Sequence, residues 1–144
     1  MEESRRISVL VVDDDRITKE LLMSILRNDG YLVVGEASNG AEAVKQYREL
    51  KPDIVLLDIS MPQMDGLQAL EEIRKSNPSA LVLFISAHFT TEKINEAIQK
   101  GAAGFVAKPF KPANVLDKLS TCWHGRNNVA SKPALRESVT LPPL

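Results

Sequence analysis

The chain has 144 residues, 44% of them hydrophobic and 26% charged, with a formal net charge of −1 and a single cysteine. This length fits one domain with its own core, the near-neutral charge gives no sign of direct nucleic-acid binding, and one cysteine excludes an intrachain disulfide. No apolar stretch approaches the roughly 20 residues that cross a bilayer, and residues 1–6 lack the apolar core of a signal peptide, so we expect a cytoplasmic protein with no membrane partner.

The first elements in chain order are a strand and an amphipathic helix. The apolar run 7–12 predicts a strand, and a helix is expected from near Asp15 to Asn28, with Gly30 as its stop. The side chains expected to form the apolar face of this helix are Ile17, Leu21, Leu22, Ile25 and Leu26.

Four further apolar runs predict four more strands, each followed by a helical pattern. The runs are 31–37, 54–57, 81–85 and 105–107. The run 31–37 partly alternates, which places it nearer a sheet edge, and 54–57 is apolar throughout, as expected of a strand covered on both faces. The residues expected to open the four following helices are Ser38 or Asn39, Asp65, Thr90 or Thr91, and Pro112. The second helix is expected to bury Ala41, Val44 and Leu50.

Strict alternation of five strands and five helices predicts an α/β fold, doubly wound, with a five-stranded parallel sheet and helices on both faces. The helical periodicity ends near residue 124. Beyond it come Pro133, Pro142 and Pro143 among scattered polar residues. We therefore expect one domain over 1–124 and a flexible carboxyl-terminal tail over 125–144.

Polar residues stand at the carboxyl ends of four of these strands. Asp13 and Asp14 follow the first strand, Asp58 the third, Ser86 the fourth and Lys108 the fifth. Parallel α/β sheets bind ligands beyond this edge, so the side chains should converge there. Clustered carboxylates need a cation, and all-oxygen ligands favour Mg²⁺, while a carboxylate can also accept a phosphoryl group. The pattern predicts a site for a divalent cation and a phosphoryl group.

Each of these residues also has an ordinary structural role to weigh. An aspartate after a strand often caps the next helix, and we assign that role to Asp15. Ser86 would bond nearby backbone, the commoner fate of a loop serine. Asp58 could be a turn residue before Met61 and Pro62, and Lys108 a solvated loop lysine. An ionised acid after four apolar residues needs a partner, however, and Lys108 is the obvious candidate for Asp58.

With these residues in place, residues 7–123 resemble the receiver domain of two-component response regulators. The segments that carry the resemblance, in chain order, are 9–15 (VLVVDDD), 52–66 (PDIVLLDISMPQMDG), 85–87 (ISA) and 101–110 (GAAGFVAKPF). The resemblance implies a flavodoxin-like sheet with strand order 2-1-3-4-5 and a cis bond between Lys108 and Pro109.

The resemblance also implies the role of each site residue. Asp58 would accept phosphate from a sensor histidine kinase or a histidine phosphotransfer protein, with Lys108 pairing with the phosphoryl group. Ser86 would move to bond that group, and Phe105 would take the aromatic switch position. The Mg²⁺ ligands implied are Asp13, Asp14, Asp58 and the backbone carbonyl of Ser60. His88 lies at a variable position beside the site.

The function expected from the resemblance is that of a single-domain signalling regulator. Phosphorylation would switch the surface formed by the fourth helix, fifth strand and fifth helix, which would control a downstream protein target and offer a homodimer contact. The chain would be no enzyme beyond self-catalysed phosphorylation and dephosphorylation. The alternatives are a degenerate receiver acting as a scaffold, an aspartyl-phosphate phosphatase of the haloacid-dehalogenase type, and a fragment of a hybrid kinase or larger regulator. That phosphatase family has a second acid two residues after its nucleophile, where this chain has Ser60.

Overall fold

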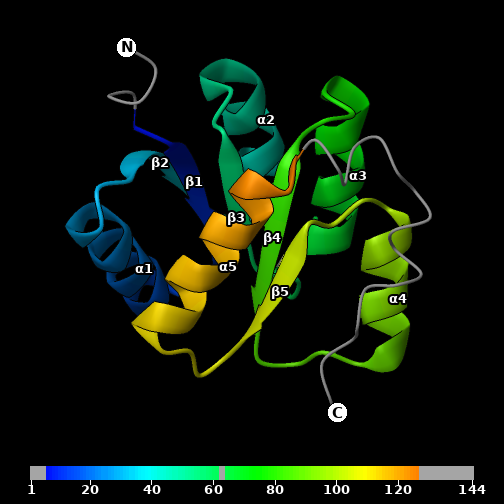
Figure 1. Ribbon diagram of the computed structural model, residues 1–144. Helices are drawn as coiled ribbons and strands as arrows, with labels where there is room; N and C mark the ends of the chain where they lie inside the picture. Colours follow the sequence, from blue (N-terminus) through cyan, green and yellow to red (C-terminus); the bar gives the residue numbers. More distant parts are fainter. Residues whose placement is uncertain (1–5, 62–63, 127–144) are drawn as a thin grey trace.

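Five parallel strands form one sheet in the order β2-β1-β3-β4-β5, with helices on both faces (Figure 1). The computed structural model describes residues 6–61 and 64–126. The strands are β1 Ser8–Val12, β2 Leu32–Ala37, β3 Ile54–Leu57, β4 Leu81–Ser86 and β5 Gly104–Ala107. The helices are α1 Arg16–Asn28, α2 Gly40–Leu50, α3 Gly66–Ser76, α4 Thr91–Gln99 and α5 Pro112–His124. The predicted fold class and strand order are confirmed.

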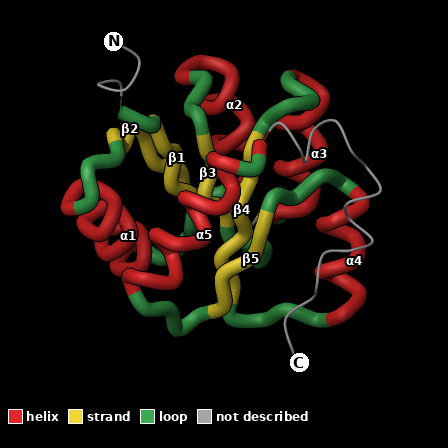
Figure 2. Tube along the Cα trace, viewed as in Figure 1, coloured by secondary structure: helices red, strands yellow, loops and turns green. Residues whose placement is uncertain are grey.

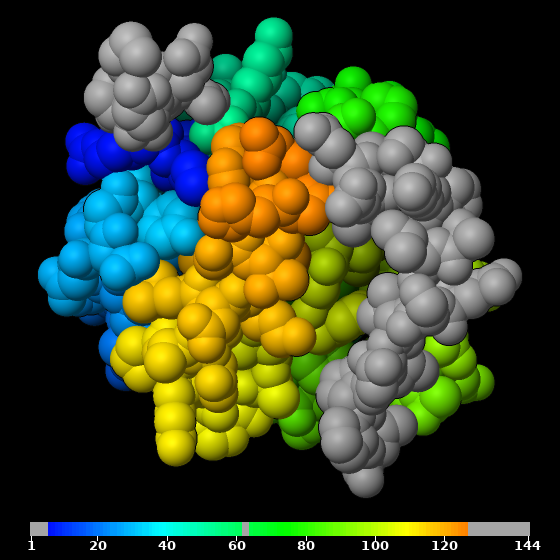
Figure 3. Space-filling view, in the orientation of Figure 1, coloured from blue at the N-terminus to red at the C-terminus, as the bar shows by residue number. Residues whose placement is uncertain are grey.

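Each face of the sheet carries its own hydrophobic core. In β1, Val9 and Val11 face the cluster that includes residues of α1 and α5, while Leu10 and Val12 face the cluster that includes residues of α2, α3 and α4. Successive side chains of a strand point to opposite faces, so a strand between two helical layers must be apolar at every position. Figure 2 shows the sheet between the two layers, and Figure 3 shows α1 and α5 covering the near face.

Side-chain caps decide where the helices begin. Asp15 accepts from the Thr18 amide at 2.9 Å, and Asn39, rather than Ser38, accepts from the amide at the start of α2. Asp65 forms a reciprocal capping box with Gln68 at the start of α3. The remaining cap is Thr90 rather than Thr91, before α4. These side chains satisfy amides that have no partner inside the helix, and so fix the starts of α1, α2, α3 and α4. Helix α5 has no side-chain cap and begins at Pro112, as predicted.

The parallel register brings the strand ends together at one edge. Val12 pairs with Leu57 and Leu57 with Phe84. The ladder continues one residue beyond the strands, because the Asp58 amide donates to the Val12 carbonyl at 3.1 Å and the Lys108 amide donates to the Ser86 carbonyl at 2.9 Å. In Figure 1 this edge lies at the lower side, where β4 leads towards α4 and β5 towards α5.

The predicted apolar face of α1 was wrong at two positions. Ile17 is 75% exposed and Leu21 50% exposed, whereas Leu22, Ile25 and Leu26 are buried as predicted. Residues four apart drift by about 40° around a helix of 3.6 residues per turn, so the series 17-21-25 rotates from the solvent side at Ile17 to the sheet side at Ile25. The residues that α1 buries are Lys19, Leu22, Met23, Ile25 and Leu26. In α2, Val44 is buried as predicted, but Ala41 in the first turn is exposed and Leu50 at the last position is 41% exposed.

Two predicted features lie outside the described residues. Pro62 of the β3–α3 loop is one, and residues 127–144 of the predicted tail are the other. The domain boundary at residue 124 stays a prediction, although α5 ends at His124. Within the described ranges, no helix has both the length and the hydropathy that a membrane span requires.

Adjacent residues of α1 provide a matched test of this packing. Leu22→Ala removes a side chain that is 1% exposed and is expected to cost about 2–5 kcal/mol of unfolding free energy, since it leaves a cavity. Leu21→Ala at the exposed neighbouring position is expected to cost less than about 1 kcal/mol. Urea unfolding of both variants measures the difference, and equal losses would contradict the assigned helix face.

Candidate functional site

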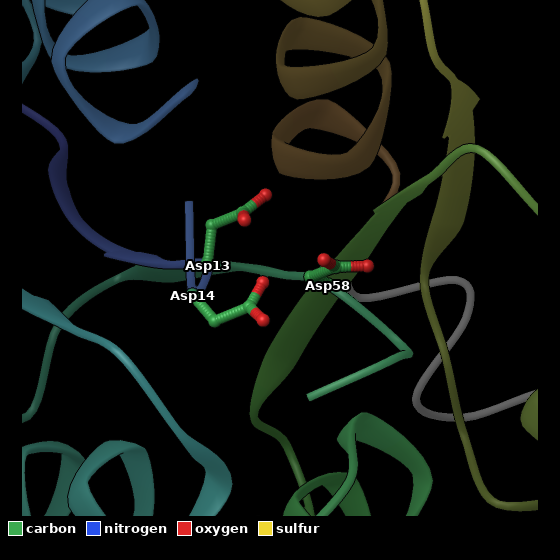
Figure 4. Close-up of side chains that lie close together, drawn as sticks. All are labelled: Asp13, Asp14 and Asp58. Atoms are coloured by element: carbon green, nitrogen blue, oxygen red, sulfur yellow. The ribbon is translucent and has the colours of Figure 1, made fainter. Parts of the chain in front are cut away.

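Three carboxylates meet at the carboxyl edge of the sheet. Asp13 and Asp14 follow β1 and Asp58 follows β3, and each offers one oxygen within 4.8 Å of those of the other two (Figure 4). Asp13 is 1% exposed and Asp58 6% exposed, while Asp14 is open to solvent. The structure therefore brings together the acids that the sequence predicts to converge.

Lys108, which follows β5, closes the cluster from the other side. Its Nζ lies 2.7 Å from Asp13 Oδ2 and 3.5 Å from Asp58 Oδ2. A contact of 3.5 Å is at the limit of hydrogen bonding, so the main partner of Lys108 is Asp13 rather than the predicted Asp58. Asp58 thus keeps a carboxylate that is buried but only weakly paired. The peptide bond between Lys108 and Pro109 is cis, as predicted.

Burial and charge act on the ionisation of these groups. Burial, followed by the negative charge of Asp13, raises the pKa of Asp58, and the opposing effect of Lys108 does not cancel this rise. Burial by itself would lower the pKa of Lys108, but its hydrogen bond to Asp13 and the charges of Asp58 and Asp13 outweigh it and raise that pKa. Lys108 therefore stays charged. Ionisation of Asp58, by contrast, costs more free energy in the folded protein than in the unfolded chain.

Asp15 plays the structural role that the sequence analysis assigns to it. Its carboxylate accepts from the amide and the hydroxyl of Thr18, and the side-chain bond with Thr18 is the main reason that the pKa of Asp15 is lowered. The Asp15 amide in turn donates to Asp13 Oδ1 at 2.8 Å. Asp15 thus caps α1 with its side chain, and its backbone amide orients the carboxylate of Asp13.

Ser86 is buried at the end of β4, and its hydroxyl oxygen accepts from the His88 amide at 3.1 Å. The hydroxyl therefore makes the local backbone contact that a loop serine commonly makes, and its own proton remains free to be donated elsewhere. The Ser60 amide donates to Asp58 Oδ1 at 3.3 Å, so the loop after β3 also contacts the acid.

Phe105 of β5 lies in an aromatic cluster with Phe84 of β4 and with Phe89. Its ring is stacked with that of Phe84, with centroids 6.3 Å apart, and meets the edge of Phe89 at 5.4 Å. Phe105 is half-buried against the core that includes α3 and α4 residues. Phe89 was not among the predicted site residues, because nothing in its local pattern shows that the β4–α4 connection folds back onto β5.

Two further residues have structural roles that the sequence analysis does not assign. Lys19 is 7% exposed, and its Nζ donates to Ser38 Oγ at 2.7 Å and lies 3.2 Å from Glu36 Oε1, tying α1 to the end of β2. Its spacing of three and seven residues from Leu22 and Leu26 places Lys19 on the buried face of α1, and this pattern was visible in the sequence. At Gly66, an added Cβ would lie 2.3 Å from the Asp58 carbonyl oxygen, so only glycine lets α3 start this close to the acid.

The raised pKa of Asp58 predicts how this residue affects stability. The folded protein binds the Asp58 proton more tightly than the unfolded chain does, so stability falls as pH rises from the ordinary carboxyl pKa through the raised native pKa. Asp58→Asn removes the charge and keeps the shape. In the presence of a chelator, this variant is expected to melt at a higher temperature than the unmodified chain at neutral pH, with the difference shrinking as pH falls.

The control for this measurement is Asp117→Asn, an exposed position on α5. It is expected to leave the melting temperature nearly unchanged at both pH values. A lower melting temperature for Asp58→Asn at neutral pH would show that the ionised carboxylate stabilises the fold.

The donor set fits a hard divalent cation. Three carboxylates converge, and within the described ranges their ion pairs are with one ammonium group, that of Lys108. Oxygen ligands and excess negative charge suit Mg²⁺, which needs only one or two carboxylates and keeps several waters. The exposed Asp14 leaves the cluster open on one side, so an incoming group has access.

Comparison with known protein families places this arrangement in context. The response regulator receiver domain family matches residues 9–120. The chemotaxis protein CheY of Thermotoga maritima is 46% identical over 112 residues, which are 78% of this chain and 93% of that protein. CheY of Listeria monocytogenes is 46% identical over 113 residues, covering 78% of this chain and 95% of the relative.

Solved structures show the same similarity. CheY in a CheX–CheY–BeF3–Mg²⁺ complex from Borrelia burgdorferi aligns with a TM-score of 0.80 and 34% identity, over 84% of this chain and 92% of that one. The signal receiver domain of a putative response regulator, NarL, from Mycobacterium tuberculosis also gives a TM-score of 0.80 and 34% identity, over 84% and 98% of the two chains.

Proposed function

The chain belongs to the response regulator receiver domain family of two-component signalling, and on this premise we propose that Asp58 is its phosphoryl acceptor. The observation that carries the proposal is the position of Asp58. Its carboxylate is buried at the end of β3, beside two acids and a lysine, yet its contact to that lysine is long. A nucleophilic carboxylate needs this combination of a fixed position and an uncommitted oxygen.

The donor is a phosphohistidine of a sensor histidine kinase or of a histidine phosphotransfer protein. An Asp58 oxygen forms the new bond to phosphorus while the bond from phosphorus to the donor nitrogen breaks, and that nitrogen takes up a proton. Lys108 stands 3.5 Å from Asp58 and bears the positive charge that the transferred group requires. Lys108 and Ser86 assist Asp58, and self-catalysed phosphorylation and dephosphorylation are the only chemistry that we assign to the chain.

We assign the metal site to Asp13, Asp14, Asp58 and the backbone carbonyl of Ser60, with Mg²⁺ as the ion. When bound, Mg²⁺ would neutralise the acids and draw charge from the phosphoryl oxygens. Asp14 is the exposed member of the cluster and Asp13 is already engaged by Lys108, so Asp14 is the more available direct ligand.

The response to phosphorylation passes through Ser86 and Phe105. A phosphoryl group adds roughly 1.5 to 2 negative charges and strong acceptor oxygens, and the Ser86 hydroxyl has a proton to donate to it. Its movement vacates space beside Phe105, the switch residue, and biases the surface of α4, β5 and α5. That surface then controls a downstream protein, and it also offers a homodimer contact. The CheY of the CheX complex supports action through protein contact.

The alternatives have less support. A scaffold that is never phosphorylated would have no use for an acceptor, metal ligands, hydroxyl and lysine all at one edge. A haloacid-dehalogenase-type phosphatase would need an acid at position 60, where the chain has Ser60. The cytoplasmic location stays a prediction.

Phosphoryl uptake tests the acceptor directly. Incubation of the full chain with Mg²⁺ and phosphoramidate is expected to add one phosphoryl group to the intact mass. Asp58→Ala is expected to add none, because the nucleophile is gone, whereas the exposed control Asp117→Ala should behave as the unmodified chain does.

Uptake that persists in Asp58→Ala would place the acceptor elsewhere. No uptake in any of these chains, in spite of measurable Mg²⁺ binding, would favour the scaffold alternative.

Neighbouring acids test the metal site. Asp14→Ala is expected to weaken Mg²⁺ binding about tenfold or more in a calorimetric titration, because it removes a direct ligand. Asp15→Ala is expected to cost about 1 kcal/mol of stability through loss of the α1 cap while changing Mg²⁺ affinity little. Equal effects of the two substitutions on affinity would mean that only the summed charge matters.

A further inference from the structure

A hollow lies at the edge of the sheet opposite the acid cluster. It has a volume of about 500 Å³ and is lined by residues that precede β3 and begin β4, together with the ends of α2 and α5. In Figure 1 the end of α5 lies at the upper side of the sheet, away from the strand ends that carry the acids. The volume is within the range of small-molecule sites, about 300–1,000 Å³.

The lining offers flat and apolar surfaces. Trp123, near the end of α5, lines the hollow beside Pro52 and Leu81. The guanidinium carbon of Arg126 stands 3.9 Å from the centroid of the Trp123 ring. Indole rings and guanidinium planes both stack on flat aromatic ligands. This part of the hollow therefore suits a planar ring.

The rim carries positive charge. Lys51 and Arg126 line the hollow, and within the described part of the chain neither has a carboxylate partner. Arg48 also lines it but is partly compensated by Glu72 at 3.9 Å. The acid in the lining, Asp53, turns Oδ2 towards Ser8, whose amide and hydroxyl donate to it at 2.8 and 3.1 Å.

The lining also contains neutral hydrogen-bonding groups. The Tyr47 hydroxyl accepts from Asn77 Nδ2 at 3.0 Å, which leaves its own proton for another acceptor. Burial raises the pKa of Tyr47, so this hydroxyl keeps its proton at neutral pH. Ser76 and Ser79 contribute further polar groups to the lining. The hollow thus combines a stacking surface, hydroxyl groups and two cations that have no acidic partner among the described residues.

We propose that this hollow is a binding site for a nucleoside monophosphate. The base lies against the Trp123 ring, and the phosphate is held by Lys51 and the guanidinium of Arg126, which bind phosphate oxygens through charge-assisted hydrogen bonds. The site shares no residue with the acid cluster, so it stands independently of phosphoryl transfer to Asp58.

Trp123 is the single tryptophan of the chain and provides a local readout. Titration of the full chain with AMP and with GMP is expected to change tryptophan fluorescence saturably for at least one of them. Adenosine and inorganic phosphate, which separate the ring from the anion, are each expected to bind at least about tenfold more weakly.

Charge-removing variants test the assigned contacts. Lys51→Gln and Arg126→Gln are each expected to weaken nucleotide binding about tenfold, since each removes a charge-assisted bond. Lys118→Gln, an exposed position on α5, is the matched control and is expected to leave the affinity unchanged. Melting temperatures of all three variants establish that they fold.

Several outcomes would overturn the proposal. The absence of a saturable signal with either nucleotide is one, and unchanged affinity in both Lys51→Gln and Arg126→Gln is another. Inorganic phosphate binding as tightly as AMP would reduce the hollow to an anion site. Asp58→Ala is expected to keep nucleotide binding, and its loss there would move the nucleotide to the acid cluster.

Discussion

The close approach of like charges at one edge of the sheet is the constraint on which the rest of the site depends. Two unit charges about 4 Å apart repel by roughly 4 kcal/mol at the effective dielectric of a partly buried site. The backbone holds them there, because the amides of Asp13 and Asp58 donate to the Ala37 and Val12 carbonyls and extend the sheet by one residue. Folding therefore supports an arrangement that the side chains alone would disperse.

Lys108 decides how that repulsion is distributed. It lies against Asp13 at 2.7 Å, so Asp13 is compensated and Asp58 is left with a raised pKa. The result separates two carboxylates of the same type into different roles. Asp13 is fixed by Lys108 and by the Asp15 amide, while Asp58 retains an oxygen that is only weakly engaged. With this arrangement, a reaction at Asp58 would leave the contacts of Asp13 in place.

Charged side chains gather at both edges of the sheet. Three acids and Lys108 lie where the strands end, whereas Lys51 and Arg126, which have no carboxylate partner among the described residues, lie with Asp53 where the strands begin. Helix α5 runs from one edge to the other, because it starts soon after Lys108 and carries Trp123 in its last turn. Parallel topology separates the two groups of loops, because every crossover returns the chain to the same edge, so loops that follow strands collect at one edge and loops that precede strands collect at the other.

The sequence by itself determined the order of elements, the acids at the strand ends and the capping role of Asp15, because these follow from local patterns and from the topology of a parallel sheet. Only the tertiary structure decided that Lys108 pairs chiefly with Asp13, that Phe89 packs on Phe105, and that Lys19 is buried while Ile17 is exposed. Those outcomes depend on distances and helix rotations set by packing between distant segments. A periodic pattern indicates which side chains are apolar, whereas the neighbouring layer determines which of them it covers.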